Sequence, residues 1–210
     1  MTPNCTRAAL SLLVAMVVAG RATAQQADSR LERLDAATRP TVAALVDSAH
    51  TAMLPTEPLV QRALEGATKR ATGDAIVAAV RRLAADLGHA RDALGSTASP
   101  AELTAGAAAL RAGASQATLA QLRHARREPL TVPLAVLADL VASGVPVDSA
   151  AAAVLGLAAQ ARDADLVEFR RAVERDIALG APPAAATAAA ATAAEVWVNA
   201  GARQQRPGRP

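Results

Sequence analysis

The chain has 210 residues, and its 22 basic and 19 acidic side chains give a formal net charge of +3 at neutral pH. Binding to nucleic-acid phosphates requires clustered Lys and Arg, and this nearly balanced composition gives no reason to expect it. Phe169 and Trp197 are the only aromatic residues in the sequence. An aromatic-lined ligand pocket and a base-stacking surface are therefore both disfavoured.

Residues 1–24 are expected to form a secretory signal peptide that is cleaved. Arg7 precedes an apolar run of about a dozen residues, and Ala22 and Ala24 before Gln25 fit a small-residue cleavage motif. The apolar run is shorter than the roughly 20 residues that a membrane-spanning helix needs. The sequence therefore predicts export to the periplasm or the extracellular space, with no transmembrane helix in the mature chain.

The single cysteine, Cys5, lies before the apolar run and is expected to be lost with the leader. A lipoprotein cysteine would directly follow that run instead. The mature chain would then have no thiol, which excludes disulfides, lipidation, thiol catalysis and a cysteine-ligated metal. Loss of Arg7 and Arg21 would also leave the mature chain with a net charge of +1.

Helical patterns extend through most of the remaining chain. Alanine accounts for 59 residues, and it is the best helix former while it buries little surface. The sequence predicts an all-α fold, an array of about eight or nine helices in helical hairpins that is either solenoid-like or an irregular bundle. Residues 25–39 are expected to form an N-terminal arm, either as a short docked helix or as loose chain. Residues 40–200 form a single alanine-rich domain, and residues 201–210 a disordered basic tail.

Three helices are expected in the first part of the domain. The first begins near Pro40 and ends near Pro55, and one face carries Val42, Leu45, Val46, Ala49 and Met53. The second is capped by Thr56 and stops at Gly66. The third covers residues 73–94, is the longest, and is broken by Gly95.

The firmest boundary in the sequence is Ser99-Pro100-Ala101-Glu102. It combines an N-cap serine, a proline at the first helical position and a glutamate that can reach back to the cap amide. Corners at Gly113, Gly144 and Gly180 are each expected to end one helix just before the next begins. Further helices are predicted at about residues 115–127, 132–143, 147–160, 163–179 and 183–199, with Asp163 as a cap.

No constellation in the sequence indicates chemistry. The three histidines, His50, His89 and His124, lie on different predicted helices, and none has a His or Cys at the spacing of a helical zinc site. The serines lack the contexts of known nucleophiles, and the glycines at 66 and 73 lack the Lys-Ser/Thr of a phosphate-binding loop. We expect no catalytic residue, no metal site and no cofactor.

Charged residues are interpreted mainly as solvated faces. The pairs Glu168–Arg171 and Arg170–Glu174 have the i+3 and i+4 spacing of an exposed helix face. Two short basic clusters, Arg81-Arg82 and residues 124–127, could meet an anionic surface, although nearby acids dilute both.

The leading hypothesis is a non-enzymatic interaction or structural protein of the cell envelope, with another envelope protein or a second copy of the chain as its partner. The last helix is the expected contact segment, because Val196, Trp197 and Val198 follow a run of almost pure Ala and Thr.

Two alternatives stay open. One is a small-ligand carrier or an enzyme whose site is assembled from scattered helices, which would require His50, His89 or His124 to meet acids in a pocket. The other is weak association with a membrane surface through Arg203, Arg206 and Arg209 of the tail.

Overall fold

The computed structural model describes residues 28–204, with side chains described as far as residue 198. Within this range the chain is all-helical and has no strand, which confirms the predicted class. A short 3-10 helix, η1 (Ser29–Arg33), precedes nine α-helices. They are α1 (Thr38–Thr51), α2 (Glu57–Thr68), α3 (Gly73–Leu94), α4 (Pro100–Ala112), α5 (Gln116–Ala125), α6 (Thr131–Ala142), α7 (Val147–Ala158), α8 (Asp163–Ala178) and α9 (Pro183–Gln204). The expected cleavage motif, Ala22, Ala24 and Gln25, lies outside the described residues.

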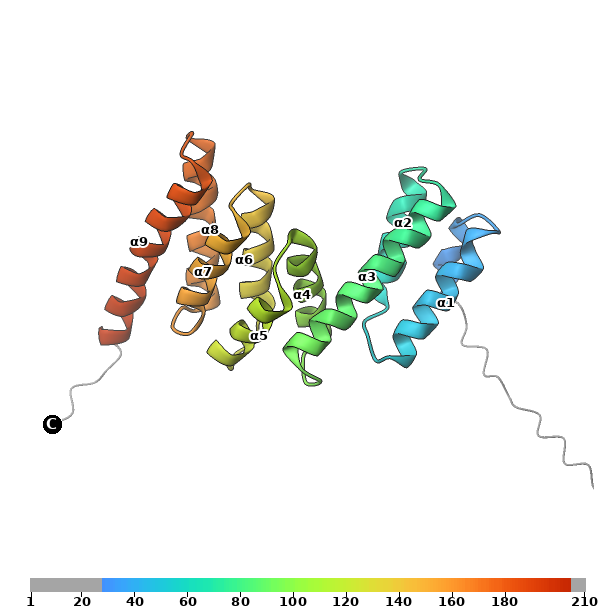
Figure 1. The fold of residues 1–210 in the computed structure, drawn as a ribbon, viewed down its shortest axis with the longest axis horizontal. Helices are drawn as coiled ribbons and strands as arrows, with labels where there is room; N and C mark the ends of the chain where they lie inside the picture. Colours follow the sequence, from blue (N-terminus) through green and yellow to red (C-terminus); the bar gives the residue numbers. More distant parts are fainter. Residues whose placement is uncertain (1–27, 205–210) are drawn as a thin grey trace, which may run out of the picture.

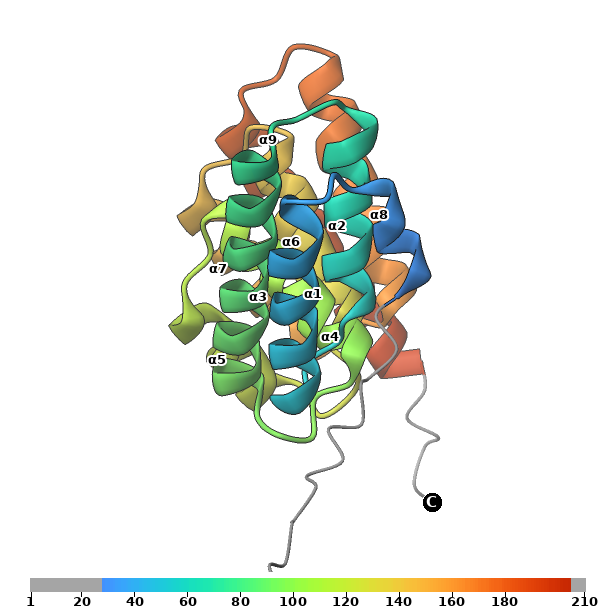
Figure 2. The ribbon, with the colours of Figure 1, turned by 90° about the vertical axis from the view of Figure 1, so that its right-hand side faces the viewer.

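The helices form an elongated array that runs from α1 at one end to α9 at the other (Figure 1). In one layer, the odd-numbered helices pack in succession, each against the next odd-numbered helix. In the other layer, α4 packs against α6 and α6 against α8. Figure 2 looks along the array from its α1 end and shows helix axes that run roughly parallel to one another.

The second layer is interrupted, because no comparable packing joins α2 to α4. The two helices instead make close contacts at different ends of α3. A Cβ added at Gly66 of α2 would lie 2.7 Å from Ile76 Cγ1, near the start of α3. A Cβ added at Gly106 of α4 would lie 3.0 Å from Ala90 Cβ, near its end. At 1.5 Å per residue, these two contact points are about 21 Å apart along α3.

The first two helices differ from the predicted ones. α1 ends at Thr51 rather than near Pro55, because Met53 adopts a left-handed backbone with φ of 57°. Met53, which was expected on the buried face, is 83% exposed. Gly66 does not stop α2, which continues to Thr68. Its missing side chain instead allows the close approach to α3.

Two further helices also depart from the expected boundaries. Arg162, not Asp163, is the residue before α8, and its backbone N–H donates to Asp165 Oδ2 at 2.9 Å. α9 continues to Gln204, so residues 201–204 of the expected tail are helical, and α9 equals α3 in length at 22 residues. Residues 205–210 lie outside the described range.

Thr56 directly precedes α2 as expected but makes no side-chain cap hydrogen bond. Other local signals agree with the structure. Ser99 Oγ accepts from the Glu102 N–H at 3.2 Å, and Glu102 Oε2 accepts from the Ser99 N–H at 2.8 Å, which completes the predicted capping box. Gly113 ends α4 with φ of 110°, a conformation that L side chains rarely adopt. Of the two alternatives for the N-terminal arm, the described part fits a docked short helix, because Leu31 and Leu34 are buried.

The core is built from Leu and Val, with Ala and Gly where helices cross. Leu140 of α6 is fully buried, whereas Leu179, just after α8, is 80% exposed. This contrast supplies a matched pair of positions with the same side chain.

We expect Leu140→Ala to lower the free energy of unfolding by about 2–5 kcal/mol, because it removes apolar contacts and leaves a cavity. Leu179→Ala should change it by less than about 0.5 kcal/mol. Urea unfolding followed by circular dichroism measures both values. Equal effects of the two substitutions would contradict the assigned core.

Glu102 has a second role beyond its capping box. The residue is only 6% exposed, and its carboxylate also accepts from the Leu130 N–H at 2.9 Å and from the Arg123 guanidinium. Burial by itself raises the pKa of Glu102, but the Ser99 and Leu130 amides, Arg123 and the Ser99 hydroxyl outweigh it and lower that pKa to about 2. The carboxylate therefore joins α4 to α5 and to the start of α6.

Because its folded pKa lies below the ordinary value of 4.5, ionised Glu102 stabilises the fold above about pH 4.5, and this contribution is lost as the pH falls toward 2. We expect Glu102→Gln to lower the free energy of unfolding at pH 7 by about 1–3 kcal/mol. Its stability should also decline less between pH 5 and pH 3 than that of the unmodified chain. Urea unfolding across this range tests both effects. Glu168→Gln on the surface of α8 is the control, and an equal loss in that variant would contradict the assignment.

Candidate functional site

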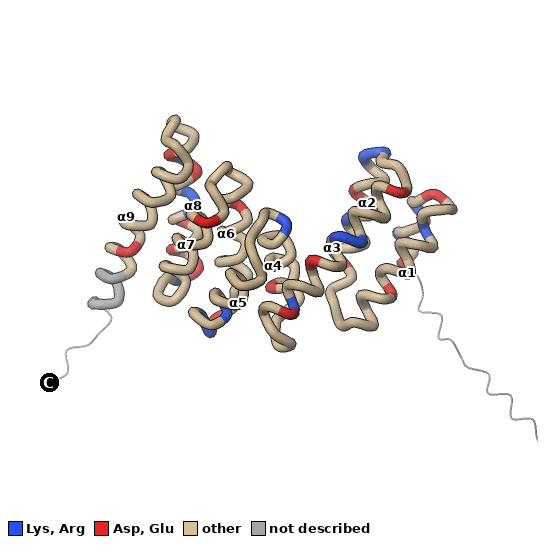
Figure 3. Tube along the Cα trace, in the orientation of Figure 1, with Lys and Arg blue, Asp and Glu red and all other residues tan. Residues whose placement is uncertain are grey.

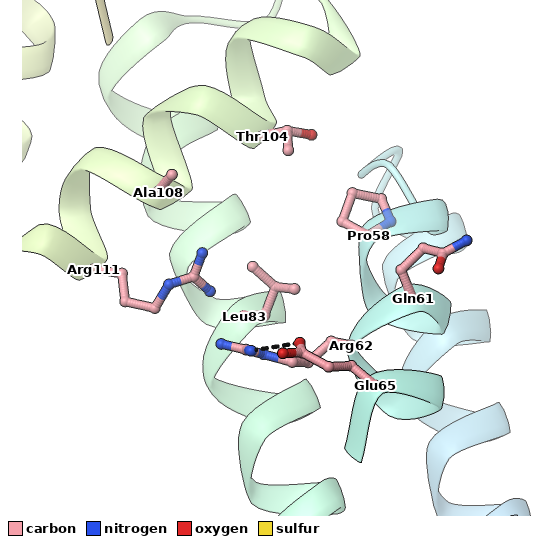
Figure 4. A pocket seen from close by; sticks show the side chains of 8 residues that line it. All are labelled: Pro58, Gln61, Arg62, Glu65, Leu83, Thr104, Ala108 and Arg111. Carbon is pink, nitrogen blue, oxygen red and sulfur yellow. Dashed lines mark hydrogen bonds and ion pairs between the residues drawn. The ribbon is translucent and has the colours of Figure 1, made fainter. Parts of the chain in front are cut away.

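A groove of about 480 Å³ opens between α2 and α4, over the middle of α3 (Figure 4). Its volume lies within the range of about 300–1,000 Å³ that is usual for ligand-binding pockets. Three helices supply its lining. These residues are Pro58, Gln61, Arg62 and Glu65 of α2, Leu83 of α3, and Thr104, Ala108 and Arg111 of α4.

Helical spacing places these side chains on the two walls. On α4, Thr104, Ala108 and Arg111 follow one another at intervals of four and three residues, so they share one face. On α2, Pro58, Arg62 and Glu65 repeat the same intervals beside the buried apolar face of that helix. Each wall is therefore a continuous stripe of one helix.

The α2 wall carries an ion-paired carboxylate. Glu65 accepts from Lys69 Nζ at 2.6 Å and from Arg62 Nη1 at 2.9 Å. Lys69 and then Arg62 lower the pKa of Glu65 through these hydrogen bonds, so the carboxylate is ionised at neutral pH. The Nε of Arg62 is buried and has no hydrogen-bond acceptor.

The α4 wall carries a guanidinium without a partner. Among the described residues, Arg111 makes no hydrogen bond or ion pair. Its side chain extends from α4 toward Leu83, and the Arg62 side chain extends toward the same place from α2 (Figure 4). Leu83 is 6% exposed and forms an apolar floor. The groove thus combines two guanidinium groups, one carboxylate and an apolar base.

The three histidines lie on three different helices of the structure. His50, His89 and His124 are exposed on α1, α3 and α5, and none of them lines the groove. Within residues 28–204, no three His, Cys, Asp or Glu side chains are grouped so that they could hold a metal ion.

Two other hollows lie elsewhere on the array. One of about 430 Å³ lies between the starts of α1 and α3, where Thr38, Asp74 and Arg81 contribute to its lining. The other, of about 190 Å³, lies between α7 and α9, beside Gln160 and Glu195. Neither brings guanidinium groups from two facing helices toward one place, and the groove is therefore the stronger candidate (Figure 4).

The basic cluster at residues 124–127 is not a uniform surface patch. Arg126 is buried, and its guanidinium donates to the Ala161 carbonyl oxygen at 2.6 Å and to Asp163 Oδ1 at 2.7 Å. It also pairs with Glu128 at 2.8 Å. Arg126 therefore connects the end of α5 to the turn between α7 and α8. No pattern in the sequence indicates this inward orientation.

The predicted contact segment of α9 is partly solvent-facing. Val196 and Trp197 are 63% and 52% exposed, whereas Val198 packs against the core. Between residues 183 and 198 the helix carries a single charged residue, Glu195, and the described part of α9 is accordingly almost entirely tan in Figure 3. The outer face of this end helix is consequently almost uncharged.

Comparisons with family models, with curated proteins and with solved structures found no match for this chain. None of the described helices is both long enough and apolar enough to cross a bilayer.

Proposed function

We propose that this protein is a non-enzymatic interaction protein of the cell envelope that binds a segment of another envelope protein in the groove between α2 and α4. The observation that carries the proposal is the interruption of the second layer. α4, α6 and α8 pack on one another, whereas the walls formed by α2 and α4 stay apart and keep polar side chains facing the space between them. Helical arrays commonly use such extended surfaces to bind other polypeptides.

The groove residues are suited to binding rather than to proton transfer. General acid–base catalysis favours a group whose pKa lies near the working pH. The single carboxylate in the groove, Glu65, has a lowered pKa because Lys69 and Arg62 donate to it. His50, His89 and His124 are exposed on three different helices and none of them lines the groove, which also weighs against the alternative of an enzyme assembled from scattered helices.

A second copy of the chain is the other candidate partner. The exposure of Val196 and Trp197 on an almost uncharged end helix favours it. An envelope location follows from the leader expected in residues 1–24, which lies outside the described structure.

Site-specific photo-cross-linking in the native host tests this function. We expect a photoreactive amino acid at Thr104, on the α4 wall, to give a covalent adduct in the envelope fraction. The same amino acid at Ala164 of α8 should give none, because Ala164 is exposed in the same layer but lies outside the groove. The chain in the adduct should begin at Gln25.

The mass of the adduct identifies the partner class. An adduct of twice the chain mass would assign a second copy as the partner, and any other discrete mass would assign a different protein. Equal cross-linking from Thr104 and Ala164, or none from Thr104, would contradict the proposed function.

A further inference from the structure

We infer that the groove between α2 and α4 recognises an acidic peptide segment, with one carboxylate of the peptide held between Arg62 and Arg111 and an apolar neighbour over Leu83. This inference rests on the proposed function and specifies the chemistry of the partner. Two observations support it: the charged side chains that face the groove, and the guanidinium N–H donors among them that have no acceptor.

The guanidinium groups outnumber the acceptors available to them. Glu65 is the one carboxylate in the lining, and each of its oxygens is already engaged, Oε1 by Lys69 and Oε2 by Arg62. Arg111 has no partner among the described residues. A guanidinium offers five N–H donors in a planar fork that matches a carboxylate. An incoming carboxylate would therefore meet donors that no described side chain satisfies.

Arg62 also has one donor without an acceptor, a state that it shares with the buried Nε atoms of Arg39, Arg123, Arg126 and Arg170. Its Nε is buried without an acceptor, although its Nη1 donates to Glu65 at 2.9 Å. A buried donor that has left water without gaining a partner is unfavourable, and an acceptor brought by a ligand would relieve that cost. Arg62 and Arg111 extend toward Leu83 from opposite walls, so one anionic group between them could accept from both (Figure 4).

The rest of the lining selects the kind of anion. Leu83, Pro58 and Ala108 present apolar surface, which suits a carboxylate carried beside apolar side chains rather than a fully hydrated ion. Thr104 Oγ1 donates to the Pro100 carbonyl oxygen at 2.8 Å, which leaves its oxygen free to accept a peptide N–H.

Other polymers fit this groove less well. It contains no aromatic side chain on which a nucleic-acid base could stack. A basic peptide would face Arg62 and Arg111 with only Glu65 to attract it, and Glu65 is already shared between two cations.

Fluorescence anisotropy with two labelled ten-residue peptides tests the inference. One peptide alternates Glu with Leu and Ser, and the other carries Gln in place of every Glu. The protein used in the assay is purified from cells that express the full-length sequence. We expect the acidic peptide to bind at least about tenfold more tightly than the amide peptide, and rising NaCl concentration to weaken its binding.

Three variants assign the effect to the groove. Arg62→Gln and Arg111→Gln should each weaken binding of the acidic peptide by roughly ten- to a hundredfold, since each removes charge-assisted hydrogen bonds. Arg171→Gln, on the exposed face of α8, should change binding by less than about twofold. Circular dichroism verifies that each variant is folded. Arg111 makes no hydrogen bond or ion pair with a described residue, so its variant remains informative even if Arg62→Gln is destabilised.

Absence of binding, equal affinity for the two peptides, or equal weakening by Arg171→Gln would overturn the inference. Its failure can be told apart from failure of the proposed function. Cross-linking from Thr104 without any preference for the acidic peptide would leave the interaction function standing and reject an acidic partner. Selective binding of the acidic peptide without a cross-link in the envelope would reject the proposed function. The inferred preference of the groove for a carboxylate would then still stand.

Discussion

The packing of α3 against two partners at separate places determines the form of this molecule. Gly66 lets α2 approach the first part of α3, and Gly106 lets α4 approach the last part. An added Cβ would lie 2.7 Å from Ile76 Cγ1 at Gly66, where something must shift, and 3.0 Å from Ala90 Cβ at Gly106, which is tighter than ordinary van der Waals contact. Leu83 lies between the two contacts and becomes the floor of the groove rather than the centre of a helix interface. The interruption of the second layer thus coincides with two close helix contacts at separate places along α3.

Buried polar contacts connect α4, which forms one wall of the groove, to helices farther along the chain. Glu102 joins the start of α4 to α5 and α6, and Arg126 joins the end of α5 to the turn before α8. Both groups are nearly inaccessible to water, so removal of either partner would leave charges or amides unsatisfied in the interior. The α4 wall that carries Arg111 is therefore supported by helices farther along the array. The α2 wall has no such support from the second layer and depends on α3, α1 and η1.

Several helix boundaries could be predicted from the sequence, whereas contacts between residues far apart in the chain could not. The capping box at Ser99, the corner at Gly113 and the buried seam of α3 were predictable, because each depends on residues within one or two turns of helix. The prediction that Gly66 ends α2 is wrong, since a glycine that permits close packing looks the same in sequence as one that ends a helix. Arg126 points inward toward Asp163, which is 37 positions away, and Arg62 converges with Arg111, which is 49 positions away. Helical periodicity does not reveal pairs so far apart in the sequence. The groove was not predicted for the same reason, because none of its three helices carries a recognisable motif.

The most direct test of this account is the distance between α2 and α4 in solution. Nitroxide labels at Gln61→Cys and Thr104→Cys, in a Cys5→Ser background that leaves no other thiol, allow it to be measured by double electron–electron resonance. Helices in direct contact have axes about 8–10 Å apart. The account predicts a single narrow distribution that is clearly longer than direct contact allows. A distribution that corresponds to packed α2 and α4 would contradict it, because the groove would then be closed.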